Sequence, residues 1–289
     1  MNRARTFADL QENELLDVLQ STGRMEPRAE LSEARADRRG WFDKPWRYGN
    51  HQVGFVPNTT TADPVLEILP GGGQGADAGL ENQPLVVKLD RVRVEDYPGV
   101  GGHDIVVNVE GTHRQGEGTV PLSFNQAYRV GRQDFAGVAG TTVFRGVNPG
   151  RQGLGLKFTT LHVASQGGKA FKTLLDSPAI RAGLTLLNAA QPALAPLTAT
   201  AQSLLESLLD TEKAAVQVFE LGLDFDTEAP AGYRLALGSY IVAQVPRDGV
   251  IHWEEWRWDR RVQAVVREGS REEYLPYNTL VFRVSRWVE

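Results

Sequence analysis

The chain has 289 residues, of which 41% are hydrophobic, and it contains 30 Gly and 15 Pro. This composition is typical of a globular protein rich in turns rather than of a disordered or coiled-coil chain. Its 31 basic and 36 acidic residues are scattered and give a formal charge of -5, which disfavours nucleic acid as a partner. No Cys is present, which excludes disulfides, thiol catalysis and cysteine-ligated zinc, and Met1 leads into charged residues, so we expect a cytoplasmic protein.

The N-terminal part predicts a helix followed by an exposed segment. Apolar residues recur at helical spacing from Thr6 to Gln20, and Gly23 stands where a helix ends. From Pro57 to Pro84 the chain is rich in Thr, Gly and Pro, which is typical of a linker. We therefore expect residues 1–83 to form a helix, a tether and a linker. The tether's arginines should be accessible to a protease: Arg24, Arg28, Arg35, Arg38 and Arg39.

Alternating apolar residues predict strands after that boundary. Such runs start at Leu85, Ile105, Leu154 and Phe219, and further strands are expected over 233–245, 253–258, 262–267 and 279–284. Strands at this density, without alternating helices, favour a β-sandwich over 84–289. The Ala- and Leu-rich segment 168–212 predicts helices inserted between strands, with Pro192 and Pro196 as breaks.

Two loops carry acidic residues in a suggestive arrangement. One is Asp96-Tyr97-Pro98-Gly99-Val100-Gly101-Gly102-His103-Asp104, a Gly-rich loop between expected strands. The other is Asp224-Phe225-Asp226, after which Leu237 to Ile241 opens the next strand. Together they resemble the calcium loops of a C2 domain, over about residues 85–245. The resemblance implies an antiparallel β-sandwich with both loops at one end.

The C2 resemblance also implies a calcium site at Asp104, Asp224 and Asp226. Pro98 and Gly232 occupy positions where the family has further aspartates, so the ligand set is incomplete. We expect no cofactor beyond weakly held calcium. The alternative is that these aspartates are ordinary turn residues, which bond to their own backbone.

Catalytic motifs are missing from the sequence. No Gly-x-Ser-x-Gly elbow, Walker sequence or metal-binding histidine pair occurs, and His103 in the Gly-rich loop is the one histidine that stands out. The run from Trp253 to Trp258 places Trp256 and Trp258 on one strand face and Trp253 on the other. These indoles predict either an interface, where Trp is a frequent anchor, or half-buried core.

Residues 182–205 carry no charge over a length that could cross a bilayer, but their Pro, Asn and Gln favour packed helices. The leading hypothesis is a non-catalytic, C2-like binding module that engages a protein partner or a membrane lipid surface. One alternative is a membrane-active effector that inserts or forms pores after release by proteolysis or a conformational change. Another is a hydrolase with carboxylates that meet only in the fold.

Overall fold

The architecture comes from a computed structural model of the chain. It describes residues 44–98, 102–115, 118–138, 140–151, 153–163, 184–185, 215–226 and 233–288. Within these residues the protein is mainly β, its sheets are mostly antiparallel, and short 3-10 turns are the remaining regular elements. The expected N-terminal helix and the Arg-rich tether lie outside the described residues, as does the expected insertion apart from residues 184–185.

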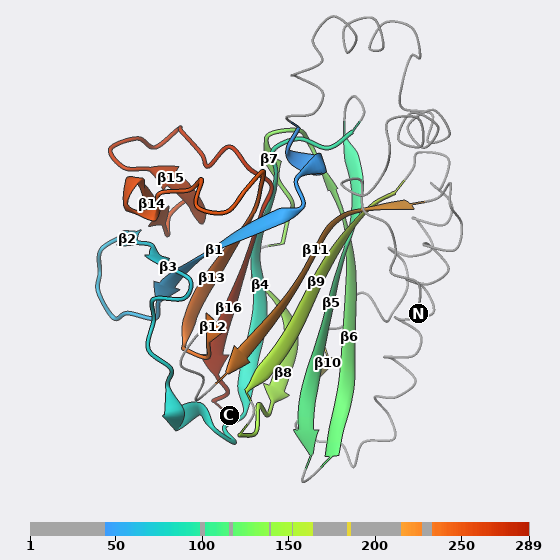
Figure 1. Cartoon of the computed structure of the whole chain (residues 1–289), viewed down its shortest axis with the longest axis vertical. Coiled ribbons are helices and arrows are strands. Elements are labelled where there is room, and N and C mark those ends of the chain that lie inside the picture. Colours follow the sequence, from blue (N-terminus) through green and yellow to red (C-terminus); the bar gives the residue numbers. More distant parts are fainter. Residues whose placement is uncertain are drawn as a thin grey trace, which may run out of the picture.

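The described strands form one large sheet and two smaller ones (Figure 1). The large sheet runs in the order β10 (Leu184–Thr185), β8 (Thr141–Val147), β4 (Leu85–Val94), β16 (Thr279–Arg286), β13 (Gly238–Val245), β1 (Asn50–Pro57) and β3 (Leu69–Pro70), with β7 (Asp134–Phe135) also paired to β4. The five-stranded sheet runs in the order β12 (Tyr233–Arg234), β11 (Ala215–Asp226), β9 (Leu154–Val163), β5 (His103–Gln115) and β6 (Gly118–Val130). The three-stranded sheet contains β15 (Ala264–Arg267), β14 (Trp256–Asp259) and β2 (Val65–Glu67).

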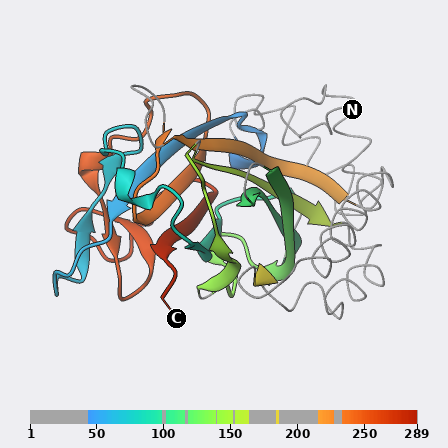
Figure 2. The same ribbon diagram turned by 90° about the horizontal axis from the view of Figure 1, so that it is seen from below.

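The large and five-stranded sheets share the main hydrophobic core. The alternating residues of β5 and β9, including Val107 and Phe158, point into it, because successive side chains of a strand face opposite sides. Phe158 of the five-stranded sheet stacks on Phe282 of the large sheet with ring centroids 4.6 Å apart. The two sheets therefore pack face to face in a sandwich-like arrangement (Figures 1 and 2).

A second core lies on the opposite face of the large sheet. Strand β13 is buried along its whole length: Tyr240 and Val242 point to the main core, whereas Ile241 and Ala243 point to the second. The three-stranded sheet covers this second face, and its Trp258 belongs to the second core. The large sheet is thus the middle layer, which explains why β13 is apolar on both faces.

A buried tyrosine fixes the entry into β13. The Tyr240 hydroxyl accepts from the Ala236 N–H at 3.0 Å and lies 3.0 Å from the Arg234 carbonyl oxygen, to which it donates. Such a bond from Tyr to the backbone a few residues upstream is found at corners where β-sandwich strands change sheet. Here the corner connects β12 of one sheet with β13 of the other.

The expected domain boundary at Pro84 is wrong for residues 50–83. Strand β1 pairs with β13 over its full length, and β2 and β3 belong to the small and large sheets. Gly54 is needed at the centre of β1, since a Cβ there would lie 2.6 Å from Ile68 Cγ2 and 3.0 Å from the Trp253 ring. The expected linker from Pro57 to Pro84 therefore contributes strands to two sheets of the folded body.

The expected strands after Pro84 are present, with two changes. The strand expected over 233–245 is divided into β12 and β13, which belong to different sheets. The segment expected as a strand from residue 253 opens with the 3-10 turn η5 (Trp253–Glu255) before β14 begins. Strands β6 and β8 were not anticipated from the sequence, because Gly, Pro and polar residues interrupt their apolar pattern.

Candidate functional site

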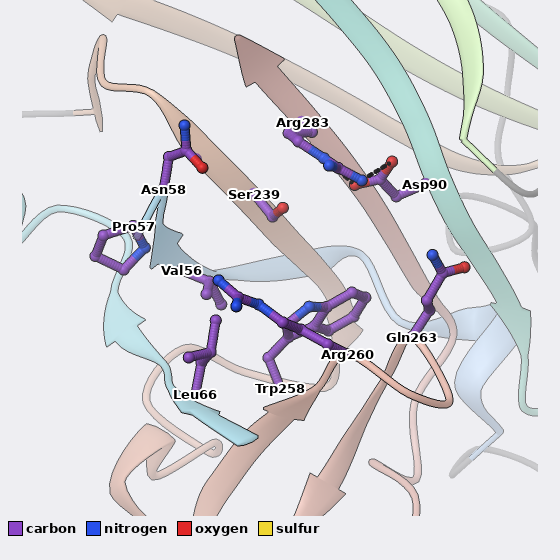
Figure 3. A pocket seen from close by; sticks show the side chains of 11 residues that line it. Val56, Pro57, Asn58, Leu66, Asp90, Ser239, Trp258, Arg260, Gln263 and Arg283 are labelled. Atoms are coloured by element: carbon purple, nitrogen blue, oxygen red, sulfur yellow. Dashed lines mark hydrogen bonds and ion pairs between the residues drawn. The ribbon is translucent and has the colours of Figure 1, made fainter. Parts of the chain in front are cut away.

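A polar cavity lies between the large sheet and the three-stranded sheet (Figure 3). We call it the Arg260 pocket, and its volume is about 180 Å³. Its walls comprise Val56, Pro57, Asn58, Leu66, Asp90, Gly238, Ser239, Trp258, Arg260, Gln263 and Arg283. Strands of two layers supply these residues, so the pocket exists only in the folded chain.

One wall carries an ion pair whose acidic partner is buried. Arg283 donates through Nε and Nη2 to the two carboxylate oxygens of Asp90, at 2.8 Å each (Figure 3). Asp90 follows the core-facing Leu89, so strand alternation places its side chain on the opposite face, and a β-bulge leaves it without a partner in the β16 register. The Asp90 carboxylate raises the pKa of the Arg283 guanidinium, since a hydrogen-bonded anion favours the charged form.

The opposite wall carries Arg260, whose guanidinium is held by main-chain carbonyl groups. Nη1 donates to the Thr61 oxygen at 2.8 Å and Nη2 to the Thr59 oxygen at 3.1 Å. In the described part of the chain, no carboxylate lies within ion-pairing distance of this side chain. The positive charge of Arg260 is therefore fixed in position without being neutralised.

A second, more open concavity adjoins the Arg260 pocket. We call it the Leu69 groove; its volume is about 550 Å³, and it shares Pro57 and Asn58 with the pocket. Its remaining lining consists of Phe55, Leu69, Gly73, Gln74, Gly75, Asp77, Ala236 and Leu237. Leu69 is one of the few large apolar side chains that the described surface exposes. Polar and apolar chambers thus lie side by side at the end of β1.

The aspartates of the expected calcium site do not converge. Asp104 lies opposite Val163 near the end of β9, whereas Asp224 lies opposite Gly155 near its start. At about 3.4 Å per residue, this places the two roughly 27 Å apart along the sheet. Asp104 instead forms an ion pair with Arg129 at 3.2 Å. The expectation that both loops lie at one end of the sandwich is wrong, because Asp104 and Asp224 lie beside opposite ends of β9.

Asp226, the third expected ligand, ends β11 and pairs through its backbone with Arg234. The described residues contain no group of three or more His, Asp or Glu side chains that could hold a metal ion.

The three tryptophans of the expected interface lie in the second core. Trp253, Trp256 and Trp258 are 3%, 7% and 6% exposed, and they pack against Ile241 and neighbouring residues of the large sheet. This burial agrees with the alternative that these indoles belong to the core rather than to an interface. Trp258 also reaches the wall of the Arg260 pocket.

His103 is fully buried at the start of β5 rather than exposed at a loop tip. Its ring lies 5.3 Å from that of His162 and 5.9 Å from that of Tyr97. The Tyr97 hydroxyl and Thr160 Oγ1 share a hydrogen bond at 2.9 Å, and burial raises the pKa of Tyr97 to about 12. These aromatic rings form a packed cluster at one end of the main core.

Each buried aspartate among the described residues pairs with a basic side chain. Asp90 pairs with Arg283, Asp104 with Arg129, and Asp259 with Arg261. Asp96 pairs with both Lys44 and Arg132, and burial nevertheless raises its pKa. Each of these four carboxylates thus has at least one cationic side chain beside it.

The remaining expectations fall on residues that the structure does not describe. These are the five arginines Arg24, Arg28, Arg35, Arg38 and Arg39, and nearly all of the uncharged run 182–205. In the described ranges no helix has the length and apolar character needed to cross a membrane.

Comparison with known proteins identifies no relative: no family model, no curated protein and no solved structure matches the chain. The pocket itself was missed by sequence reasoning. Asp90 and Arg283 lie 193 positions apart, and no sequence motif singles out Arg260. Only the fold brings the three residues together.

Proposed function

We propose that the chain is a non-catalytic binding module that engages an extended segment of a partner protein. The observation that carries this proposal is the pair of adjoining concavities, the Arg260 pocket and the Leu69 groove. Binding sites typically combine an apolar surface with a few placed polar groups, which fix the orientation of the ligand. The Leu69 groove provides the apolar surface and the Arg260 pocket provides the polar groups, and the two adjoin at Pro57 and Asn58.

The Leu69 groove and the adjoining Arg260 pocket favour a partner segment in which an apolar side chain lies next to a polar one. Leu69 is 36% exposed at the end of the large sheet, where β3 is an edge strand of only two residues. Gly75 borders the same groove, and a Cβ at that position would meet no atom within 4 Å. The floor is therefore open enough to accept a side chain without rearrangement. The cysteine-free composition supports a cytoplasmic setting for this role.

A random peptide display library, selected on the full-length chain, tests the proposal. Peptides with an apolar residue should be enriched, and Leu69→Asp should weaken their binding at least about tenfold, since the change places a charge on the apolar surface. Val288→Asp is the matched control, because Val288 is also exposed but lies outside the groove. Enriched peptides that bind the Leu69→Asp and Val288→Asp variants equally would overturn the proposal, as would a selection that enriches none.

A further inference from the structure

The Arg260 pocket presents more hydrogen-bond donors than its own residues use. Asn58 and Gln263 carry side-chain amides, and Ser239 carries a hydroxyl. Within the described ranges none of these three side chains hydrogen-bonds to another protein group. They surround a guanidinium, Arg260, which is itself only partly satisfied by two carbonyl oxygens. A ligand that accepts hydrogen bonds would therefore find donors on several sides.

The charge of the pocket walls also favours an acceptor that is negative. Asp90 is the acidic residue of the lining, and both of its oxygens accept from Arg283 in a fork geometry. Such a bidentate pair largely cancels its own charge. Arg260 then contributes a net positive charge at the mouth of the cavity. Because the guanidinium is held by neutral carbonyls, an anion would not have to displace a competing carboxylate.

The cavity has room for a small oxyanion. Its volume of about 180 Å³ is well above the roughly 10–15 Å³ that one water molecule needs by the same measure, so an oxyanion fits together with waters. Guanidinium groups bind planar or tetrahedral oxyanions in preference to neutral acceptors, through charge-assisted bonds.

We infer that the Arg260 pocket binds an oxyanion, a carboxylate or phosphate group, through Arg260, Asn58, Gln263 and Ser239. This inference rests on the proposed function, because we take the oxyanion to be a group of the partner segment whose apolar side chain lies in the Leu69 groove. The two chambers share Pro57 and Asn58, so an acidic or phosphorylated residue a short distance from an apolar one would reach both. A free phosphate or carboxylate ion offers the same chemistry.

Two-dimensional NMR on the isotope-labelled full chain tests the site directly. The indole N–H of Trp258, which lines the pocket, is the reporter, and Trp258→Phe assigns it. Titration with sodium phosphate or sodium acetate at constant ionic strength should shift this resonance saturably, with a Kd of roughly 1–10 mM. Acetamide, a neutral isostere of acetate, should leave it in place. Equal shifts with acetamide and acetate would overturn the inference.

Variants separate the pocket from general charge effects. Arg260→Gln should weaken phosphate binding by about tenfold or more, whereas Arg260→Lys should retain part of it as a point charge. Arg271→Gln is the matched control, because it removes the same charge from an exposed site. Arg260 also holds the loop at Thr59 and Thr61, so Asn58→Ala and Ser239→Ala provide an independent reading of the same site. Unchanged binding in both alanine variants, or equal loss with Arg271→Gln, would overturn the assignment.

Display peptides distinguish failure of this inference from failure of the proposed function. The oxyanion site predicts that replacing the acidic residue of an enriched peptide by its amide weakens binding to the wild type but not to Arg260→Gln. Peptides that bind through the Leu69 groove and show no such coupling would refute the oxyanion site alone. Saturable binding of phosphate with no peptide enriched would leave the oxyanion site standing and reject the protein-binding role.

Discussion

Arg283 donates hydrogen bonds to both carboxylate oxygens of Asp90 at 2.8 Å. Asp90 is almost fully buried, whereas the Arg283 side chain is half exposed. The arrangement spans β4 and β16 and closes one wall of the Arg260 pocket. An anion buried in this way is tolerable only while its partner is present, since removal leaves an uncompensated charge in the fold.

Replacing Arg283 with Leu should therefore destabilise the protein by about 2–3 kcal/mol. The double variant Asp90→Leu with Arg283→Leu should recover much of that loss, because no unpaired charge remains. Arg286→Leu, on the same strand, is the control: its pairing with Asp77 is exposed and 3.9 Å long, so it should cost below about 1 kcal/mol. Urea denaturation measures all three changes, and additive losses in the double variant would contradict the argument.

Sequence periodicity predicted the strands that have long apolar runs. β5 and β9 alternate apolar and polar residues in such runs, and β13 was predicted although it is buried on both faces. β1 was not predicted, because Val53, Gly54, Phe55 and Val56 form only a short apolar run without alternation. A run of that kind has no period that distinguishes it from a loop or a short helix.

The site could not be predicted because its walls come from strands that are far apart in the sequence. Asp90 lies in β4 and Arg283 lies 193 positions later in β16, and only the strand order of the sheet makes them neighbours. The expected convergence of the aspartates is wrong for a related reason: Asp104 and Asp224 lie in strands that each pair with β9, but near its opposite ends. Loop composition alone does not say at which end of a sheet a loop lies.

Tyr240→Phe should destabilise the fold by about 1–2 kcal/mol. The hydroxyl satisfies the buried Ala236 N–H, and losing one partner of a buried hydrogen bond costs the desolvation of the other. The ring itself, stacked on Phe282 at 5.1 Å, stays in place. Tyr233→Phe is the matched control, since its hydroxyl bonds to none of the groups that the structure describes. Thermal or urea unfolding that ranks the two variants equally would refute the role of the corner.

The stability of the protein should fall in mild acid partly through His51. Burial against Phe219, with ring centroids 4.5 Å apart, lowers the pKa of His51 from 6.5 to about 4. Between pH 6.5 and about pH 4, His51 therefore binds a proton in the unfolded chain but stays neutral in the folded chain. The contribution of neutral His51 is complete above pH 6.5 and is lost as the pH falls towards 4, by at most about 3 kcal/mol.

His51→Phe should reduce the loss of stability between pH 6.5 and pH 4, because the variant cannot bind a proton at this position. His252→Phe is the control, since that imidazole is 64% exposed. Burial lowers the pKa of His113 as well, so some acid sensitivity should persist in both variants. Urea denaturation at neutral pH and near pH 4.5 measures the difference, and parallel losses in the wild type and the His51→Phe variant would exclude this histidine as a cause.

Gly54 and Gly75 provide the sharpest test of whether residues 50–83 are part of the folded body, because Gly54 lies in β1 and Gly75 in the Gly- and Pro-rich segment that resembles a linker. A Cβ at Gly54 would lie 2.6 Å from Ile68 and 3.0 Å from Trp253, between the large and three-stranded sheets. Gly54→Ala should therefore cost about 1–3 kcal/mol by overpacking, and Gly54→Val more. A Cβ at Gly75 meets nothing within 4 Å, so Gly75→Ala should change the free energy of unfolding by less than about 1 kcal/mol. Urea denaturation followed by tryptophan fluorescence reports on both, since Trp253 contacts the first site. If the two alanine variants unfold alike, β1 is not packed between the layers and the linker interpretation returns.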